Sequence, residues 1–268
     1  MIRTARSRRS ARVVLLAYAV VAYAVIAYAV IAYALFLVVF ADLILFLAGA
    51  GLPDGIDDGA PVTAWLAAVV DVGLLLLFAL QHSVMARPRF KRRWVELVPS
   101  SIERSTYVLA ATTALGLLIW QWRPLADDVW SIDAGWARLV LWGGFGAGWA
   151  LVVFSSFLLD HVELFGLGPA LRRVQHRTAP RPALRQPGLY RYVRHPLLLG
   201  FLIAFWSTPD MSAGRLLLAV GATAYIVIAV RFEEHDLRQE LGPHYEDYQQ
   251  RVPRFVPRLL RSSVEDDT

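Results

Sequence analysis

The sequence predicts an all-α, polytopic integral membrane protein with about five to six transmembrane helices, a C-terminal helical hairpin and a tail helix. The chain is 57% hydrophobic and its mean hydropathy is +0.47. It nevertheless carries 27 Lys and Arg residues, nearly all of them arginine, in blocks between long apolar runs. A bilayer, rather than one large soluble core, is therefore the expected environment of most apolar side chains.

The apolar runs predict the order of the spans. The first is longer than the ~20 residues that cross a bilayer, so we expect it to tilt or to protrude. The last two are short and are separated by a polar break at 208–214, which indicates a hairpin with its ends near the polar surface. The runs cover residues 13–48, 62–84, 106–122, 136–159, 195–209 and 214–231.

The loops between the runs alternate in charge, which predicts their orientation. Arginine-rich blocks precede the first run, follow the second and fill residues 160–194, whereas aspartates follow the first and third runs. Cytoplasmic loops carry the excess of Lys and Arg, so both termini are expected in the cytoplasm, in a bacterial-type inner membrane. Anionic lipid then explains the net charge of +5, and nucleic acid is not an expected partner. The sequence does not indicate the oligomeric state.

The first run contains a tyrosine repeat, in which Tyr18, Tyr23, Tyr28 and Tyr33 are spaced five apart. Five residues rotate an α-helix by about 500°, so successive tyrosines step about 140° around it and line no single face. We interpret this run as a lipid-facing or packing helix without chemistry, and residues 1–60 as a separate N-terminal region.

The chain has no cysteine, so catalysis would depend on His, carboxylate or Tyr side chains. Two titratable residues interrupt the second apolar run. Asp71 lies near the middle of the run, where an ionised carboxylate is costly unless it is paired. It is interpreted as a buried acid paired with an arginine or a hydroxyl. His82 follows at nearly the same helical angle, so both side chains are expected to face the bundle interior.

A second polar cluster ends the fourth run, where His161 is flanked by Asp160 and Glu163. The two acids share one helix face if the helix continues. His161 projects about 100° away from Asp160, so adjacency in sequence does not make them a hydrogen-bonded pair. Because the polar clusters lie at the cytoplasmic ends of the second, fourth, fifth and sixth runs, we expect one functional site at that face.

The predicted hairpin has Arg194 and His195 at its entrance and Glu233 and Glu234 at its exit. Charges at that depth are costly unless something cationic or polar lies between them. Gly242-Pro243 is expected to break the last helix after Leu241, and Tyr245 and Tyr248 then share a face of a short amphipathic tail helix.

These clusters belong to linked motifs, whose combined spacing is more specific than any one of them. The motifs are Gln81–Arg87, Ile102–Tyr107, Trp120–Trp122, His161–Leu167, Arg194–Gly200, Glu233–Leu237, Gly242–Tyr248 and Val252–Pro257. Together they resemble the isoprenylcysteine carboxyl methyltransferase superfamily, and the earlier motifs resemble its methanethiol S-methyltransferase branch with the NnrU-like relatives. The resemblance covers about residues 80–257 and indicates one membrane methyltransferase domain over 61–268. Leu198 departs from the superfamily pattern, which has Tyr there, so apolar packing would replace any contact of that ring.

The resemblance implies S-adenosylmethionine, and no metal, at the cytoplasmic ends of the last two spans and the tail helix. Glu233 or Glu234 would take its ammonium group, and Arg194 or Arg254 its carboxylate. His195 and the tyrosine rings suit adenine and ribose, and Gly200 would let the ligand or a neighbouring helix approach closely. The implied set is Tyr190, Val193, Arg194, His195, Pro196, Leu199, Gly200, Glu233, Glu234, Tyr245, Tyr248 and Arg254.

The reaction that the resemblance favours moves a methyl group from S-adenosylmethionine to the sulfur of methanethiol, giving dimethyl sulfide and S-adenosylhomocysteine. A thiolate and a sulfonium combine into neutral products, so a dry pocket favours the transition state. A neutral thiol must first lose its proton, for which a positioned base contributes roughly 10²–10⁴-fold. His161 is the first candidate base, oriented by Asp160 or Glu163, and His82 is the second.

Two alternatives remain open. A larger lipophilic acceptor, such as a prenylcysteine carboxylate, a phospholipid amine or an isoprenoid, would need a lateral opening between spans. A non-enzymatic NnrU-like membrane protein or small transporter would use Asp71 and His82 in a polar pathway.

Overall fold

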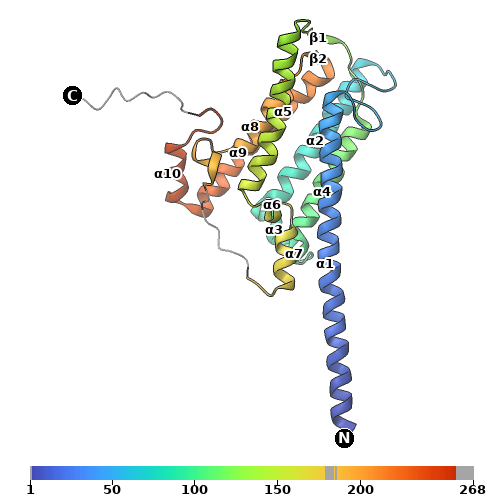
Figure 1. Ribbon diagram of the computed structural model, residues 1–268, viewed down its shortest axis with the longest axis vertical. Helices are drawn as coiled ribbons and strands as arrows, with labels where there is room; N and C mark the ends of the chain where they lie inside the picture. The colour runs from blue at the N-terminus through green and yellow to red at the C-terminus, as the bar shows by residue number, and fades with distance from the viewer. Residues whose placement is uncertain (1, 179–183, 185, 258–268) are drawn as a thin grey trace, which may run out of the picture.

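The computed structural model describes residues 2–178, 184 and 186–257, with side chains in the first helix described from Leu16 onward. The side chains of the N-terminal arginine block, and residues 258–268 of the predicted second domain, lie outside this description. Helices dominate the described chain (Figure 1). They are α1 (Ile2–Ala48), α2 (Ala64–Ala86), α3 (Pro88–Trp94), α4 (Ser100–Gln121), α5 (Gly135–Leu158), α6 (His161–Leu164), α7 (Leu167–Val174), the 3-10 turn η1 (Gly188–Arg191), α8 (Pro196–Trp206), α9 (Ala213–Leu241) and α10 (Pro243–Arg251).

Within the described residues, four helices are long and apolar enough to cross a membrane: α1 from Leu16, α2, α5 and α9. The helix α4 spans 22 residues, but Glu103, Arg104 and several hydroxyl groups make it more polar. The helix α8 has 11 residues, about 16 Å of helix against a hydrocarbon core of about 30 Å. The chain is therefore an all-α integral membrane protein. The bundle also contains α4, which is long but more polar, and α8, which is apolar but short.

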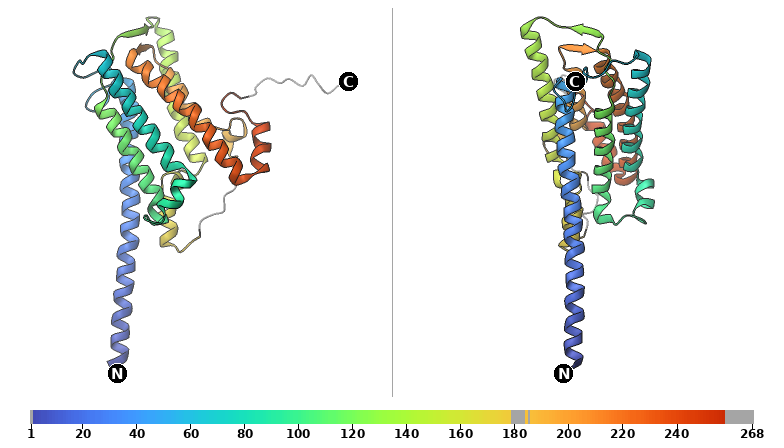
Figure 2. Two further views of the ribbon diagram at one scale, coloured as in Figure 1. Left: turned by 180° about the vertical axis from the view of Figure 1, so that it is seen from behind. Right: turned by 90° about the vertical axis from the view of Figure 1, so that its right-hand side faces the viewer.

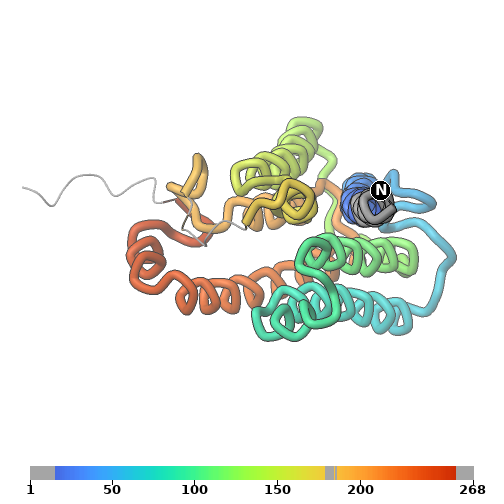
Figure 3. The backbone as a smooth tube through the Cα atoms, turned by 90° about the horizontal axis from the view of Figure 1, so that it is seen from below, coloured from blue at the N-terminus to red at the C-terminus, as the bar shows by residue number. Residues whose placement is uncertain are grey.

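The helices α5 and α8 pack backbone to backbone at the centre of the bundle. A Cβ atom on Gly148 would lie 2.7 Å from the carbonyl oxygen of Gly200, and one on Gly200 would lie 2.7 Å from that of Gly148. Close approach of a neighbouring helix, one of the two predicted reasons for Gly200, is therefore present. Seen along the bundle, α8 lies between α5 and α9, while α2 and α4 lie side by side (Figure 3).

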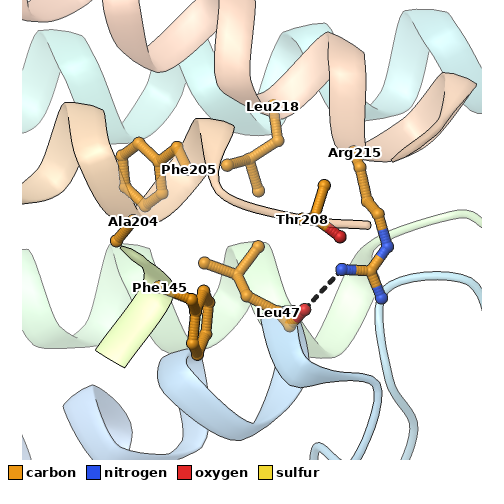
Figure 4. A pocket seen from close by; sticks show the side chains of 7 residues that line it. All are labelled: Leu47, Phe145, Ala204, Phe205, Thr208, Arg215 and Leu218. Carbon is orange, nitrogen blue, oxygen red and sulfur yellow. Dashed lines mark hydrogen bonds between the residues drawn. The ribbon is translucent and has the colours of Figure 1, made fainter. Parts of the chain in front are cut away.

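The polar break in the hairpin forms a strand, β2 (Asp210–Ser212), which pairs antiparallel with β1 (Asp128–Ser131). The prediction of an all-α chain did not include this short ribbon. Salt bridges stabilise the same end of the bundle, with Arg215 bound to Asp57 and Arg138 bound to Asp210. A small, mostly apolar pocket lies beside Arg215, whose guanidinium donates to the carbonyl of Leu47 (Figure 4).

Asp71 is fully buried in α2, and its Oδ1 accepts the backbone N–H of Arg123 at 2.9 Å. The predicted pairing with an arginine is therefore made by the backbone N–H group and not by the guanidinium. His82 contacts Tyr107 of α4, and Asp71 contacts Arg123, two residues after α4 ends, so both polar residues of α2 face into the bundle, as predicted.

The end of the bundle opposite the β1–β2 ribbon carries α3, α6 and α7 (Figure 1). The N-terminal part of α1 extends beyond the other helices at this end, in keeping with its predicted excess length. The helix α9 leans away from the bundle, so that α10 stands to one side of it (Figure 2). The helix α9 continues to Leu241, ten residues past the end of the predicted span. Gly242 then turns the chain with a φ of +56°.

Candidate active site

Glu234 is the centre of an ion cluster between α8, α9 and the tail, which we call the hairpin–tail cluster (Arg194, His195, Glu234, Arg254). The Glu234 side chain is 1% exposed. Its Oε1 accepts from Nε of Arg194 at 2.9 Å and lies 3.3 Å from Nε2 of His195, while its Oε2 accepts from Nη2 of Arg254 at 2.6 Å. A buried carboxylate is tolerated when its charge is paired and hydrogen-bonded in this way.

Arg194 binds the tail to the hairpin. Its Nη1 donates to the carbonyl oxygens of Gln249 and Val252, and its backbone N–H donates to that of Pro253 at 2.9 Å. Each of the three guanidinium nitrogens is engaged, and the side chain is only 8% exposed. Of the two arginines predicted for a cofactor carboxylate, Arg254 is therefore the accessible one, with a side chain that is 47% exposed.

Three buried tyrosines line the inner side of the tail helix. Tyr248 donates its hydroxyl proton to the carbonyl oxygen of Tyr190 at 2.6 Å, and its ring lies 5.8 Å from that of Tyr245. Burial raises the pKa of Tyr190 and Tyr245, and that of Tyr248 to about 12, so all three are neutral at pH 7. The hydroxyl of Tyr190 is buried and has no hydrogen-bond partner in the described part of the chain.

The remaining predicted residues of the Arg194–Gly200 motif set the start of α8. Val193 is buried, and Pro196 is the first residue of the helix, where the missing N–H is no loss. Leu199 is partly buried and donates its backbone N–H to the carbonyl of His195 at 3.0 Å. These residues hold His195 in place through packing and backbone geometry.

Glu233 differs from its neighbour Glu234 because its side chain is 52% exposed. Its Oε2 lies 3.8 Å from Nδ1 of His195, too far for a hydrogen bond. It is the more available of the two predicted carboxylates. Glu233 and Tyr225 both lie on α9, which packs against α2 and α10, so this helix connects the surroundings of His82 to those of the tail.

His82 lies among aromatic rings from α2, α4 and α9. Phe78 stacks on the imidazole at 5.3 Å, Tyr107 lies at 5.2 Å, and Tyr225 meets it edge-on at 6.3 Å, all between ring centroids. Nε2 is 2.8 Å from the Tyr107 hydroxyl. Nδ1 is buried and has no hydrogen-bond partner among the residues described.

His161 has both ring nitrogens occupied. Ser156 donates its proton to the carbonyl of Val153 at 2.7 Å, so it accepts from Nδ1–H of His161 at 2.9 Å. Nε2 then accepts from the Tyr33 hydroxyl of α1 at 2.6 Å, and Phe157 stacks on the ring at 4.2 Å. Burial lowers the pKa of His161, which keeps the imidazole neutral at pH 7.

The two acids beside His161 have other contacts. Glu163 forms a two-point salt bridge with Arg172 of α7, so the prediction that Glu163 orients the imidazole is wrong. Asp160 adopts a left-handed conformation with a φ of +78° and accepts the backbone N–H of Glu163 at 3.2 Å, as the N-cap of α6. Both residues therefore shape the turn between α5 and α7.

The two candidate bases have different partners. His82 contacts rings of α2, α4 and α9, whereas the hydrogen bonds of His161 lead to α1 and α5. Sequence reasoning did not single out three tyrosines that contact these histidines. Two of them could have been recognised from the sequence, because Tyr107 ends one of the motifs and Tyr33 belongs to the α1 repeat. Tyr225 is a lone tyrosine in an apolar run, which gives no such indication.

Comparison with known proteins places the chain in a family. No solved structure matches it. It is 47% identical to a methanethiol S-methyltransferase of a Pseudomonas species, over 83% of this chain and 86% of the relative, and 46% identical to methanethiol S-methyltransferase 2 of Bradyrhizobium diazoefficiens, over 96% and 95%. It is also 32% identical to nurim of Bos taurus, over 68% and 77%. The NnrU protein family matches residues 72–251, and this chain belongs to that family.

Proposed function

We propose that this protein transfers the methyl group of S-adenosylmethionine to the sulfur of methanethiol, giving dimethyl sulfide. The names of relatives that are 46–47% identical over most of their length support the reaction. The structural observation that carries the proposal is the position of Glu233. It is a half-exposed carboxylate on α9, the helix that contributes Glu234 to the hairpin–tail cluster and Tyr225 to the surroundings of His82.

The residues of the hairpin and the tail fit S-adenosylmethionine. Glu233 binds the ammonium group and Arg254 the carboxylate, since both side chains remain about half exposed. The buried hydroxyl of Tyr190 lacks a partner in the described structure, and it suits the ribose or the adenine. The cofactor supplies a methyl group on a positively charged sulfur, which a negative charge and aromatic rings stabilise.

The location within a membrane protein favours the reaction in two ways. A thiolate and a sulfonium lose their charges as they react, so exclusion of water stabilises the transition state relative to the reactants. Methanethiol is small and apolar enough to arrive through the bilayer, so the site needs no wide polar entrance. We place this site, and both termini, on the cytoplasmic side, because the flanking loops are rich in arginine.

A headspace assay tests the proposed reaction. Membranes containing the protein, supplied with methanethiol and S-adenosylmethionine, should release dimethyl sulfide. Membranes without the protein, and reactions without S-adenosylmethionine, are the controls. Methylation of a prenylcysteine or a phospholipid in place of the thiol would favour the larger-acceptor alternative. Absence of methyl transfer across a panel of thiols and lipids would support a non-enzymatic role.

A further inference from the structure

We infer that His82 is the residue that accepts the thiol proton, in an acceptor site walled by Phe78, Tyr107 and Tyr225. The inference rests on the proposed function and adds to it the place where the thiol binds. The three rings come from α2, α4 and α9, and they surround the imidazole at centroid distances of 5.2–6.3 Å.

The hydrogen bonding of His82 leaves one nitrogen for a ligand. Nε2 is 2.8 Å from the Tyr107 hydroxyl, whereas Nδ1 is buried without a partner in the described residues. A buried polar atom that lacks a partner is unfavourable, and a bound thiol would remove this cost. When Nε2–H donates to the Tyr107 oxygen, the lone pair of Nδ1 is free to accept a proton.

The aromatic wall matches the chemistry of the acceptor. Sulfur makes favourable contacts with aromatic rings at distances of about 5 Å, so three rings around one imidazole suit a small thiol better than a polar alcohol or an amine. Phe78 and Tyr225 also contact each other, with ring centroids 6.2 Å apart, so the wall is continuous between α2 and α9.

Charged groups on all three helices surround this site. Arg104 of α4 lies over the ring of Tyr107, 5.0 Å from its centroid. Arg87 of α2 lies over Phe232 and forms a 3.0 Å salt bridge with Asp236 of α9. Glu233 lies on α9, the helix that contributes Tyr225 to the aromatic wall. The proposed ammonium partner and the proposed acceptor site therefore share this helix.

The proton step balances with the groups named. The thiol proton passes to Nδ1 of His82, and the sulfur lone pair forms the new S–C bond. The bond from the methyl carbon to the positively charged sulfur of the donor breaks, and its electron pair stays on that sulfur. The imidazolium then returns the proton to water. His161 is less suited to this role, because a thiol would have to displace Tyr33 or Ser156 from its nitrogens.

Substitution of His82 tests the inference. His82→Ala should lower turnover of methanethiol by about 10²-fold or more at neutral pH, the usual contribution of a positioned base. The affinity for S-adenosylmethionine, measured by calorimetry, should be unchanged. The pH–rate profile should lose the acidic limb that reports protonation of an imidazole, and part of the rate should return at high pH, where solvent supplies thiolate. Tyr107→Phe, which removes only the hydroxyl, should shift the acidic limb and lower turnover less.

His176→Ala is the matched control. This histidine is hydrogen-bonded to Tyr18 in an exposed position after α7, so turnover and pH profile should not change. The inference is wrong if His82→Ala retains the acidic limb, if it loses cofactor affinity together with turnover, or if His161→Ala abolishes the limb instead. A wild-type protein that makes no dimethyl sulfide would contradict the proposed function itself, which separates the two failures.

Discussion

Glu233 and Glu234 are adjacent on α9 but have different surroundings. One residue rotates an α-helix by about 100°, so one carboxylate points into the hairpin–tail cluster while the other remains half exposed. The buried one is compensated by two guanidinium groups and an imidazole, and the exposed one is free to bind a cation. The same pair of residues therefore combines a structural role with a binding role.

Glu234→Gln should destabilise the protein. The substitution keeps the volume but removes the charge that Arg194 and Arg254 share, and loss of one partner from a buried ion cluster costs about 3–5 kcal/mol. The tail should detach from the hairpin at a lower temperature, which thermal unfolding of the purified protein in detergent would reveal. An unchanged unfolding temperature would show that the cluster does not hold the tail.

Glu233→Gln is the matched variant, and it should act on the ligand instead. We expect a free energy of unfolding within about 0.5 kcal/mol of that of the wild type, as for most surface substitutions. The affinity for S-adenosylmethionine should be lower by about tenfold. Normal affinity in Glu233→Gln with intact stability would exclude this carboxylate as the ammonium partner.

The sequence predicted this pair of acids and the arginines near it, but it did not divide their roles. The motif spacing places Arg194, Glu233, Glu234 and Arg254 near one another. Which carboxylate is buried depends on the rotation of α9 against α8 and the tail. That rotation is set by contacts distant in sequence, such as the Arg194 bond to the Gln249 carbonyl.

At the scale of elements, glycines decide how closely helices approach. Gly148 and Gly200 allow α5 and α8 to pack backbone to backbone, which fixes the entrance of the hairpin against the central helix. This contact accounts for the position of His195 at the start of α8. Gly143 of α5 does not take part, since a Cβ atom on it would meet no atom within 4 Å.

Gly148→Ala should therefore destabilise the protein by about 1–3 kcal/mol, the usual cost of overpacking. Its Cβ would lie 2.6 Å from the backbone nitrogen of Ala204, which cannot move without shifting α8. Gly143→Ala on the same helix should have the unfolding temperature of the wild type or a slightly higher one. Equal unfolding temperatures for the two variants would refute close packing at Gly148.

The first helix illustrates what a local pattern leaves open. The tyrosine repeat was correctly predicted to line no single face, and Tyr23 is 74% exposed. Tyr18, Tyr28 and Tyr33 nevertheless make hydrogen bonds to His176, Thr106 and His161. Three different segments meet α1 at different heights and angles, so tyrosines that share no stripe each find a partner. A helical-wheel argument on α1 alone lacks those neighbours.

At the scale of the molecule, polarity separates the two ends of the bundle. The β1–β2 ribbon and two salt bridges close one end, and the candidate site lies with the arginine-rich segments towards the other (Figure 1). Span positions could be predicted to within a few residues for α2 and α5, because bilayer thickness fixes the apolar length. The extension of α9 into polar sequence could not, since tertiary contacts of Glu234 stabilise it.

The chain has no cysteine, which makes its proposed topology directly testable. Single cysteines at two exposed positions, Ala60→Cys and Arg89→Cys, would mark the two ends. A membrane-impermeant maleimide applied to intact cells should label Ala60→Cys and spare Arg89→Cys, and both should react after lysis. The reverse pattern would place the candidate site outside the cytoplasm.

The most direct measurement of the central claim follows the methyl group itself. Purified protein in liposomes is supplied with S-adenosylmethionine carrying an isotopically labelled methyl group and with unlabelled methanethiol, and the headspace is analysed by mass spectrometry. The account predicts dimethyl sulfide with one labelled methyl group, formed in proportion to S-adenosylhomocysteine and strongly reduced in Glu233→Gln at limiting cofactor. Dimethyl sulfide without the label, or none at all from folded protein that binds the cofactor, would contradict it.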